Sequence, residues 1–129
     1  SGEGGRVILE FSESAAMRDV DGAVAFCNAA HGEGIEVGID RFGSSPLRLR
    51  EIAQLPLDFV KLDATLLEMP AFAAAAALGS SFGWRTLASR VSSAQQLRAI
   101  EGVGIDWVQG YHLGPPMTVA DFLGWAETI

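Results

Sequence analysis

The chain has 129 residues, enough for one domain with a sizeable hydrophobic core. Hydrophobic residues make up 49% of it and charged residues 19%, which excludes an intrinsically disordered protein. A net charge of −7, with no basic stripe in the sequence, argues against a general nucleic-acid binder and against a membrane-surface protein. A small anionic ligand held by a few arginines remains compatible with this charge.

Cysteine content and hydropathy predict a cytoplasmic location. Cys27 is the only cysteine in the sequence, so no internal disulfide can form and a reducing compartment is the default. No signal-peptide pattern is visible, and the longest apolar run, Ala71–Leu78, is too short to span a bilayer. We expect one domain over residues 7–129 and interpret residues 1–6 as a linker or a cloning remnant.

Apolar strands alternate with helices along the chain. The predicted strands are Val7–Phe11, Glu36–Phe42, Phe59–Leu62, Trp84–Ala88 and Ile105–Gln109. The predicted helices are Asp19–Ala30, Pro46–Ala53, Ala71–Leu78, one capped by Ser92 or Ser93, and a last one capped by Thr118. This alternation predicts a parallel sheet with right-handed crossovers, either an open doubly wound sheet or part of a (β/α)8 barrel. A complete barrel is excluded because it needs about 250 residues.

Polar side chains collect where the predicted strands end. In parallel α/β folds the chemistry lies at these carboxyl ends. The residues at or just after them are Glu10, Glu13, Asp40, Arg41, Lys61, Asp63, Ser89, Arg90 and Gln109. Converging carboxylates are what Mg²⁺ or Mn²⁺ requires, since hard cations take oxygen ligands, and a nearby lysine can orient a water or hold a phosphate. The pattern therefore outlines a site for phosphodiester hydrolysis.

Four motifs, in order and at similar spacing, resemble those of the EAL domain family, the bacterial phosphodiesterases that cleave cyclic di-GMP. They are Leu9–Ser14 (LEFSES), Ile39–Ser44 (IDRFGS), Leu55–Asp63 (LPLDFVKLD) and Val108–Tyr111 (VQGY). The family patterns are L-E-(I/L)-T-E-S, (L/I)-D-D-F-G-(T/S), L-P-(V/I)-D-x-(L/I)-K-(I/L)-D and V-Q-G-Y. The resemblance implies a partial (β/α) barrel of about five parallel strand–helix units, the latter part of the family's TIM-like barrel.

The resemblance also implies roles for four residues. It makes Glu10 and Asp40 metal ligands, and Lys61 and Gln109 residues of the catalytic site. The family's first half, which carries the E-A-L tripeptide with a metal-binding glutamate and asparagine, has no counterpart in this sequence. We therefore expect all four positions to be vestigial, with no cofactor unless a partner completes the site for Mg²⁺ or Mn²⁺.

Two departures from the family pattern strengthen this expectation. Arg41 stands at the second aspartate of D-D-F-G and opposes cation binding. Ala88–Ser92 (ASRVS) matches the family's A-E-G-V-E segment without either glutamate. Arg41 and Arg90 are candidate phosphate ligands, and they are equally interpretable as compensating charges in an inactive site. Lys61 is expected to pair with Asp40 or Glu10.

Three functions remain possible at this stage. The first is a catalytically inactive regulatory domain that acts through protein–protein contacts in cyclic di-GMP signalling. The second is a receptor that binds cyclic di-GMP weakly without hydrolysing it, and the third is a phosphodiesterase completed by another chain. A partial barrel leaves open sheet edges, which predicts a homo-oligomer or packing against another domain of a larger signalling protein. The resemblance implies that Asp40–Arg50 contributes to the interface.

Overall fold

The described residues form one sheet whose first five strands are parallel and alternate with helices. The computed structural model describes residues 8–43, 49–105, 107–110, 117–118 and 120. The strands are β1 (Ile8–Ser12), β2 (Glu36–Asp40), β3 (Phe59–Asp63), β4 (Arg85–Val91), β5 (Trp107–Gly110) and β6 (Met117–Thr118). They lie side by side in chain order, with β1 to β5 parallel and β6 antiparallel to β5. The five predicted parallel strands are confirmed, whereas β6 was not predicted.

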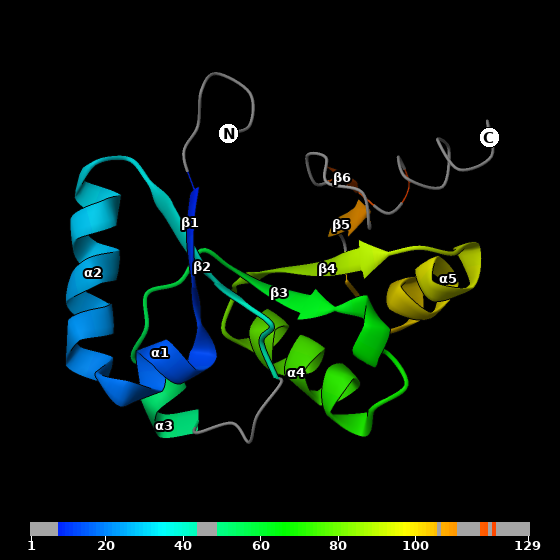
Figure 1. The fold of residues 1–129 in the computed structure, drawn as a ribbon, viewed down its shortest axis with the longest axis horizontal. Coiled ribbons are helices and arrows are strands. Elements are labelled where there is room, and N and C mark those ends of the chain that lie inside the picture. Colours follow the sequence, from blue (N-terminus) through cyan, green and yellow to red (C-terminus); the bar gives the residue numbers. More distant parts are fainter. Residues whose placement is uncertain (1–7, 44–48, 106, 111–116, 119, 121–129) are drawn as a thin grey trace.

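The helices surround one side of this sheet. They are α1 (Glu13–Arg18), α2 (Val20–Gly32), α3 (Leu49–Ile52), the 3₁₀ helix η2 (Ala64–Leu66), α4 (Pro70–Ser81) and α5 (Ala94–Gly102). In Figure 1 the sheet curves, with α2 to its left, α4 below β3 and α5 to the right of β4. Parallel strands joined by helices on one face form the wall of a (β/α) barrel, so the alternative of an open doubly wound sheet is wrong. In the described parts of the chain, no helix has the length and apolar character needed to cross a membrane.

Side-chain caps set where the helices begin. The Ser12 hydroxyl accepts a hydrogen bond from the Ala15 N–H at 3.1 Å, and Asp19 caps α2 through the Gly22 N–H at 3.0 Å. Ser93 caps α5 in the same way through Gln96. Pro70 occupies the first turn of α4, where its missing N–H costs nothing.

Two helix predictions extend beyond the described residues. Of the helix predicted over Pro46–Ala53, the described part is α3, which ends at Ile52. The helix predicted after Thr118 also falls largely outside the described residues, and Thr118 itself ends β6. The short helix α1 was not predicted, because its six residues are too few to show an apolar period.

The hydrophobic core lies between the sheet and the helices. Val37, Ile39, Val60, Leu62, Ala88 and Val108 alternate along the strands and face the helices. Cys27 of α2 is fully buried in this core, as its predicted place on a helix face suggested. Burial, reinforced by the charge of Asp58, raises the pKa of the Cys27 thiol. The thiol therefore stays protonated and unreactive near neutral pH.

Asp58, within the LPLDFVKLD motif, holds the opposite end of the sheet together. Its Oδ2 accepts a hydrogen bond from the Val37 N–H at 2.7 Å and lies 2.8 Å from His31 Nε2. His31 lies in the last turn of α2, so one carboxylate joins α2, β2 and the start of β3. This part of the motif is structural and lies away from the strand carboxyl ends.

Candidate functional site

A row of three side chains crosses the helix-free face of the sheet near the strand carboxyl ends. Lys61 Nζ of β3 lies 2.6 Å from Glu10 Oε2 of β1 and donates a hydrogen bond to Gln109 Oε1 of β5 at 3.3 Å. The three strands alternate with β2 and β4, and alternate strands supply the side chains of one layer inside a (β/α) barrel. We call Glu10, Lys61 and Gln109 the lysine layer.

Lys61 is nearly buried, with 11% of its side chain exposed, against 25% for Glu10. A buried ammonium is costly unless a carboxylate and further acceptors neutralise it. Glu10 supplies the charge and Gln109 an amide oxygen, so the ammonium is paired from both sides. Of the two partners predicted for Lys61, the structure therefore selects Glu10.

Asp40 ends β2 without a hydrogen bond to Lys61. Its Oδ1 accepts a hydrogen bond from the backbone N–H of Arg41 at 2.9 Å. Arg41 has φ of 55°, in the left-handed region that non-glycine residues enter at a cost on the order of 1 kcal/mol. The guanidinium that follows Asp40 is exposed to solvent, beside the position where a metal ligand was expected.

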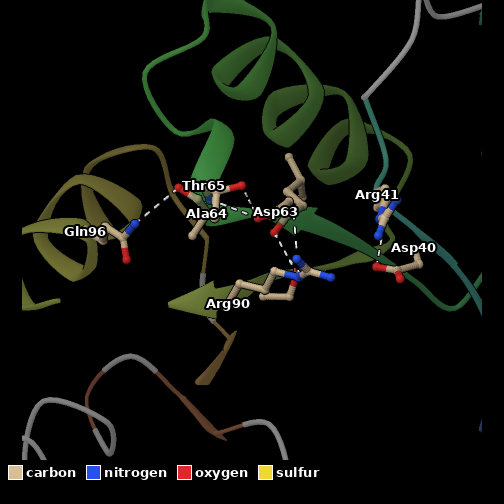
Figure 2. A network of polar contacts seen from close by, with 9 residues as sticks. Asp40, Arg41, Asp63, Ala64, Thr65, Arg90 and Gln96 are labelled. Carbon is tan, nitrogen blue, oxygen red and sulfur yellow. Dashed lines mark hydrogen bonds and ion pairs between the residues drawn. The ribbon is translucent and has the colours of Figure 1, made fainter. Parts of the chain in front are cut away.

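Asp63 and Arg90 form a second polar group at this edge, shown in Figure 2. Asp63 Oδ1 accepts hydrogen bonds from the N–H and hydroxyl of Thr65 at 2.9 and 2.7 Å, and so caps η2. Arg90 Nε lies 3.9 Å from Asp63 Oδ2, and half of the Arg90 side chain is exposed. Gln96 of α5 donates to the Ala64 carbonyl at 3.4 Å and joins α5 to this group.

Arg90 also has a positive φ, of 61°. In the A-E-G-V-E pattern its position belongs to glycine, the residue that enters this region freely. Arg90 lies in β4 where the register against β5 shifts between Ala88 and Val91, so arginine has the backbone conformation that glycine favours. Ser89, at the position of the family's glutamate, donates to the Leu62 carbonyl at 3.4 Å.

Glu13 is a site residue whose role the sequence did not indicate. It is 3% exposed, and its Oε1 accepts a hydrogen bond from the Gly43 N–H at 2.9 Å. Gly43 follows β2 in the segment that resembles D-D-F-G, so a buried carboxylate anchors that loop. Gly43 has φ of 84°, and a Cβ added there would lie 2.7 Å from the Ala75 Cβ, so this position requires glycine. The second glutamate of LEFSES was the only available signal.

The described residues do not fit the divalent-cation site that the sequence resemblance implies. Among them, no three or more His, Cys, Asp or Glu side chains are grouped so as to hold a metal ion. Glu10 is paired with Lys61, Asp40 accepts a hydrogen bond from the backbone N–H of Arg41, and Asp63 caps η2. Mg²⁺ is held in proteins by one or two carboxylates together with several waters, and these described carboxylates are each directed to another partner.

The sequence of this chain matches the EAL domain family over residues 3–116. Among curated proteins, it is 25% identical over 130 residues to the probable cyclic di-GMP phosphodiesterase PdeN of Escherichia coli, covering 95% of this chain and 25% of PdeN. It is 29% identical over 129 residues to the bifunctional diguanylate cyclase/cyclic di-GMP phosphodiesterase MucR of Pseudomonas aeruginosa, covering 94% of this chain and 19% of MucR. The chain thus spans a quarter or less of these relatives.

Solved structures share the fold. The PaMucR phosphodiesterase in complex with c-di-GMP matches with a TM-score of 0.73 and 28% identity, over 89% of this chain and 50% of that one. The EAL domain of Mycobacterium smegmatis DcpA matches with a TM-score of 0.70 and 25% identity, over 95% and 58%. The chain therefore corresponds to about half of each solved domain.

Proposed function

This chain belongs to the EAL domain family, and from that premise we propose that it is a non-hydrolysing regulatory domain of cyclic di-GMP signalling. It acts through contacts with other proteins. The names of the relatives PdeN and MucR support the signalling system. Their hydrolytic activity does not transfer with the family, because the chain spans a quarter or less of each.

The observation that carries the proposal is the change of two residues at the strand carboxyl ends, where the family pattern has carboxylates. Arg41 places a cation directly after the ligand position Asp40, and Ser89 replaces a glutamate. Divalent ions that polarise the phosphodiester and activate water are the main source of rate acceleration in such hydrolysis. In the described part of the chain, Arg41 and Ser89 stand where two of the family's carboxylates would help to hold such ions.

The test is hydrolysis of cyclic di-GMP by the purified chain in the presence of Mg²⁺ or Mn²⁺. We expect no linear dinucleotide above the amount formed by the Lys61→Ala variant. The EAL phosphodiesterase of Pseudomonas aeruginosa MucR serves as the positive control under the same conditions. Turnover that disappears in Asp40→Asn would contradict the proposal, because it would require a working metal ligand.

One observation favours the receptor as a second candidate function. Among the described residues, Arg41 and Arg90 are the two non-glycine residues with positive φ. Arg41 follows β2 and Arg90 is the next-to-last residue of β4, and both are exposed, so their guanidinium groups lie near the carboxyl ends of the strands. Backbone strain of this kind is found at binding sites, and a guanidinium binds phosphate through two parallel hydrogen bonds.

Calorimetric titration with cyclic di-GMP, without metal, tests the receptor. Saturable binding that weakens about tenfold in Arg41→Ala and in Arg90→Ala would support it. Arg98→Ala is the matched control, because Arg98 is an exposed arginine on the helix α5 and not on a strand. Equal affinity of all four proteins, or no heat at all, would eliminate this function and leave protein contacts alone.

For the protein contact we propose a second copy of this chain, joined along β1. In the described residues β1 pairs only with β2, and its Ile8, Leu9 and Glu10 are exposed. A strand edge is self-complementary under a twofold axis, and unpaired edges tend to associate. Since one chain corresponds to about half of a solved EAL domain, two copies provide about as many strands as one complete domain.

Light scattering after gel filtration tests this association. We expect a dimer for the chain and a monomer for Leu9→Lys, because a lysine at the edge opposes strand pairing. Phe82→Lys is the control, since Phe82 is equally exposed, at 37%, but lies after α4. A monomeric wild-type chain would contradict self-association and favour the alternative predicted from the sequence, another domain of a larger signalling protein. The predicted interface Asp40–Arg50 includes residues 44–48, which lie outside the described residues.

A further inference from the structure

An apolar patch lies beside the open edge of the sheet, on the face that the helices cover. It consists of Leu9 and Phe11 of β1 and Phe26 of α2, two elements that lie next to each other at the left-hand end of the molecule in Figure 1. The ring centroids of Phe11 and Phe26 are 5.8 Å apart. Leu9 is 37% exposed and Phe26 is 44% exposed, so the patch is open to solvent. We call these three residues the edge patch.

The part of α2 around Phe26 carries no charge. From Gly22 to Ala30 the sequence is GAVAFCNAA, in a chain that has 16 acidic residues and a net charge of −7. Two copies of so acidic a chain repel each other where their carboxylates meet. This segment lets them approach without that repulsion, and the edge patch gains free energy when its apolar surface is removed from water.

The strand edge alone is too small to hold two copies together. β1 has five residues. A stable protein–protein interface buries about 800 Å² on each partner and uses about 20–30 residues a side. Two copies joined along β1 therefore need a further contact surface, and the surface next to β1 on the helix-covered face is α2.

A twofold axis through the middle of β1 brings the two α2 helices together. The antiparallel register that pairs all five residues centres on Glu10, so Leu9 of one copy lies opposite Phe11 of the other. The centres of the two β1–β2 pairs are then two strand spacings apart, about 10 Å, which is the separation of packed helices. Phe26 is the middle residue of α2, so the two Phe26 side chains meet near the axis.

We propose that α2 forms the second layer of a twofold interface, in which Phe26 packs against Phe26 of a second copy while the two β1 strands pair. The inference rests on the proposed association along β1 and names the surface that stabilises it. At the other end of the sheet, β5 is already paired with β6. Association through the β1 edge, with the same surface on both copies, closes as a dimer and does not extend into a filament.

The first test is the dimer dissociation constant of Phe26→Glu, from light scattering over a dilution series. The two added carboxylates face each other near the axis, and we expect the dimer to weaken at least about hundredfold. Phe82→Glu is the matched control, because Phe82 is 37% exposed and its ring lies 4.8 Å from Trp84, but it follows α4. We expect this control to dimerise like wild type. Equal dissociation constants for the two variants would overturn the inference.

Cysteine cross-linking tests the same contact without adding charge, and it decides if Phe26→Glu does not fold. Phe26→Cys is expected to form a disulfide-linked dimer on oxidation by diamide, because facing Cα atoms of helices about 10 Å apart lie within disulfide reach. Asn28→Cys is the control, since Asn28 is exposed about 200° further around α2 and is expected to form no such link. The native Cys27 is buried and its raised pKa keeps it unreactive.

The outcomes separate this inference from the proposed function. A monomeric wild-type chain contradicts the association along β1 and this inference with it, and leaves the hydrolysis assay to decide the non-hydrolysing role. A wild-type dimer that Leu9→Lys dissociates, but in which Phe26→Glu has no effect and Phe26→Cys forms no cross-link, retains the strand pairing and overturns only the role of α2.

Discussion

Two ion pairs on the helix-free face of the sheet have the same design and different surroundings. Glu10–Lys61 joins β1 to β3 across β2, and Glu36–Arg85 joins β2 to β4 across β3. The Lys61 side chain is 11% exposed and has Gln109 as an additional partner, whereas the Arg85 side chain is 43% exposed. The two carboxylates are equally covered, at 25% exposure for Glu10 and 24% for Glu36, so the two pairs differ in the burial of the cation.

Breaking the buried pair tests this comparison most strongly. In Lys61→Met the Glu10 carboxylate loses its counter-charge, and we expect the free energy of unfolding to fall by about 3 kcal/mol. The figure is at the low end for buried pairs because a quarter of the Glu10 side chain remains exposed. Urea unfolding measures it, and a loss below about 1 kcal/mol would place this pair with surface ion pairs.

The pairing can also be disturbed without touching a charge. Gly38→Ala adds a Cβ that would lie 2.2 Å from the Phe59 ring, and Gly38 is the register partner of Glu10 on the neighbouring strand. We expect a loss of about 2 kcal/mol, typical of overpacking. Gly102→Ala is the control, because an added Cβ there meets nothing within 4 Å. Equal stability of the two variants would show that the close approach at Gly38 is relieved without cost.

Glu13 is a buried carboxylate that accepts a hydrogen bond from a backbone N–H, so it can be compared with Glu10, whose partner is a cation. Glu13→Gln keeps an acceptor for the Gly43 N–H and loses the charge, so we expect a loss of about 1 kcal/mol. Glu13→Ala removes the acceptor as well and is expected to cost about 2 kcal/mol. Thermal unfolding of both variants checks this order. If Glu13→Gln is no more stable than Glu13→Ala, the hydrogen bond to Gly43 does not contribute to the stability of this segment.

The sequence predicted the framework of the fold because its signals are local. Alternating apolar strands and capped helices gave the five parallel strands, and the motif order placed Glu10, Lys61 and Gln109 at their carboxyl ends. Which residues meet could not be derived, because the choice between Glu10 and Asp40 as the partner of Lys61 depends on the strand register. The left-handed backbone of Arg41 and Arg90 was equally hidden, since arginine is rarely chosen for that conformation.

The smallest effect is expected at the exposed pair. Arg85→Met removes a cation whose side chain is 43% exposed, so solvent already screens most of its attraction to Glu36 and the free energy of unfolding should fall by about 0.5 kcal/mol. Added salt should reduce this difference further, because solvent-exposed charges are screened within about 8 Å at physiological ionic strength. The loss in Lys61→Met should persist in the same salt, because water and ions have little access to the buried ammonium. If salt weakens both pairs alike, burial does not distinguish them, and the lysine layer behaves as an ordinary surface contact.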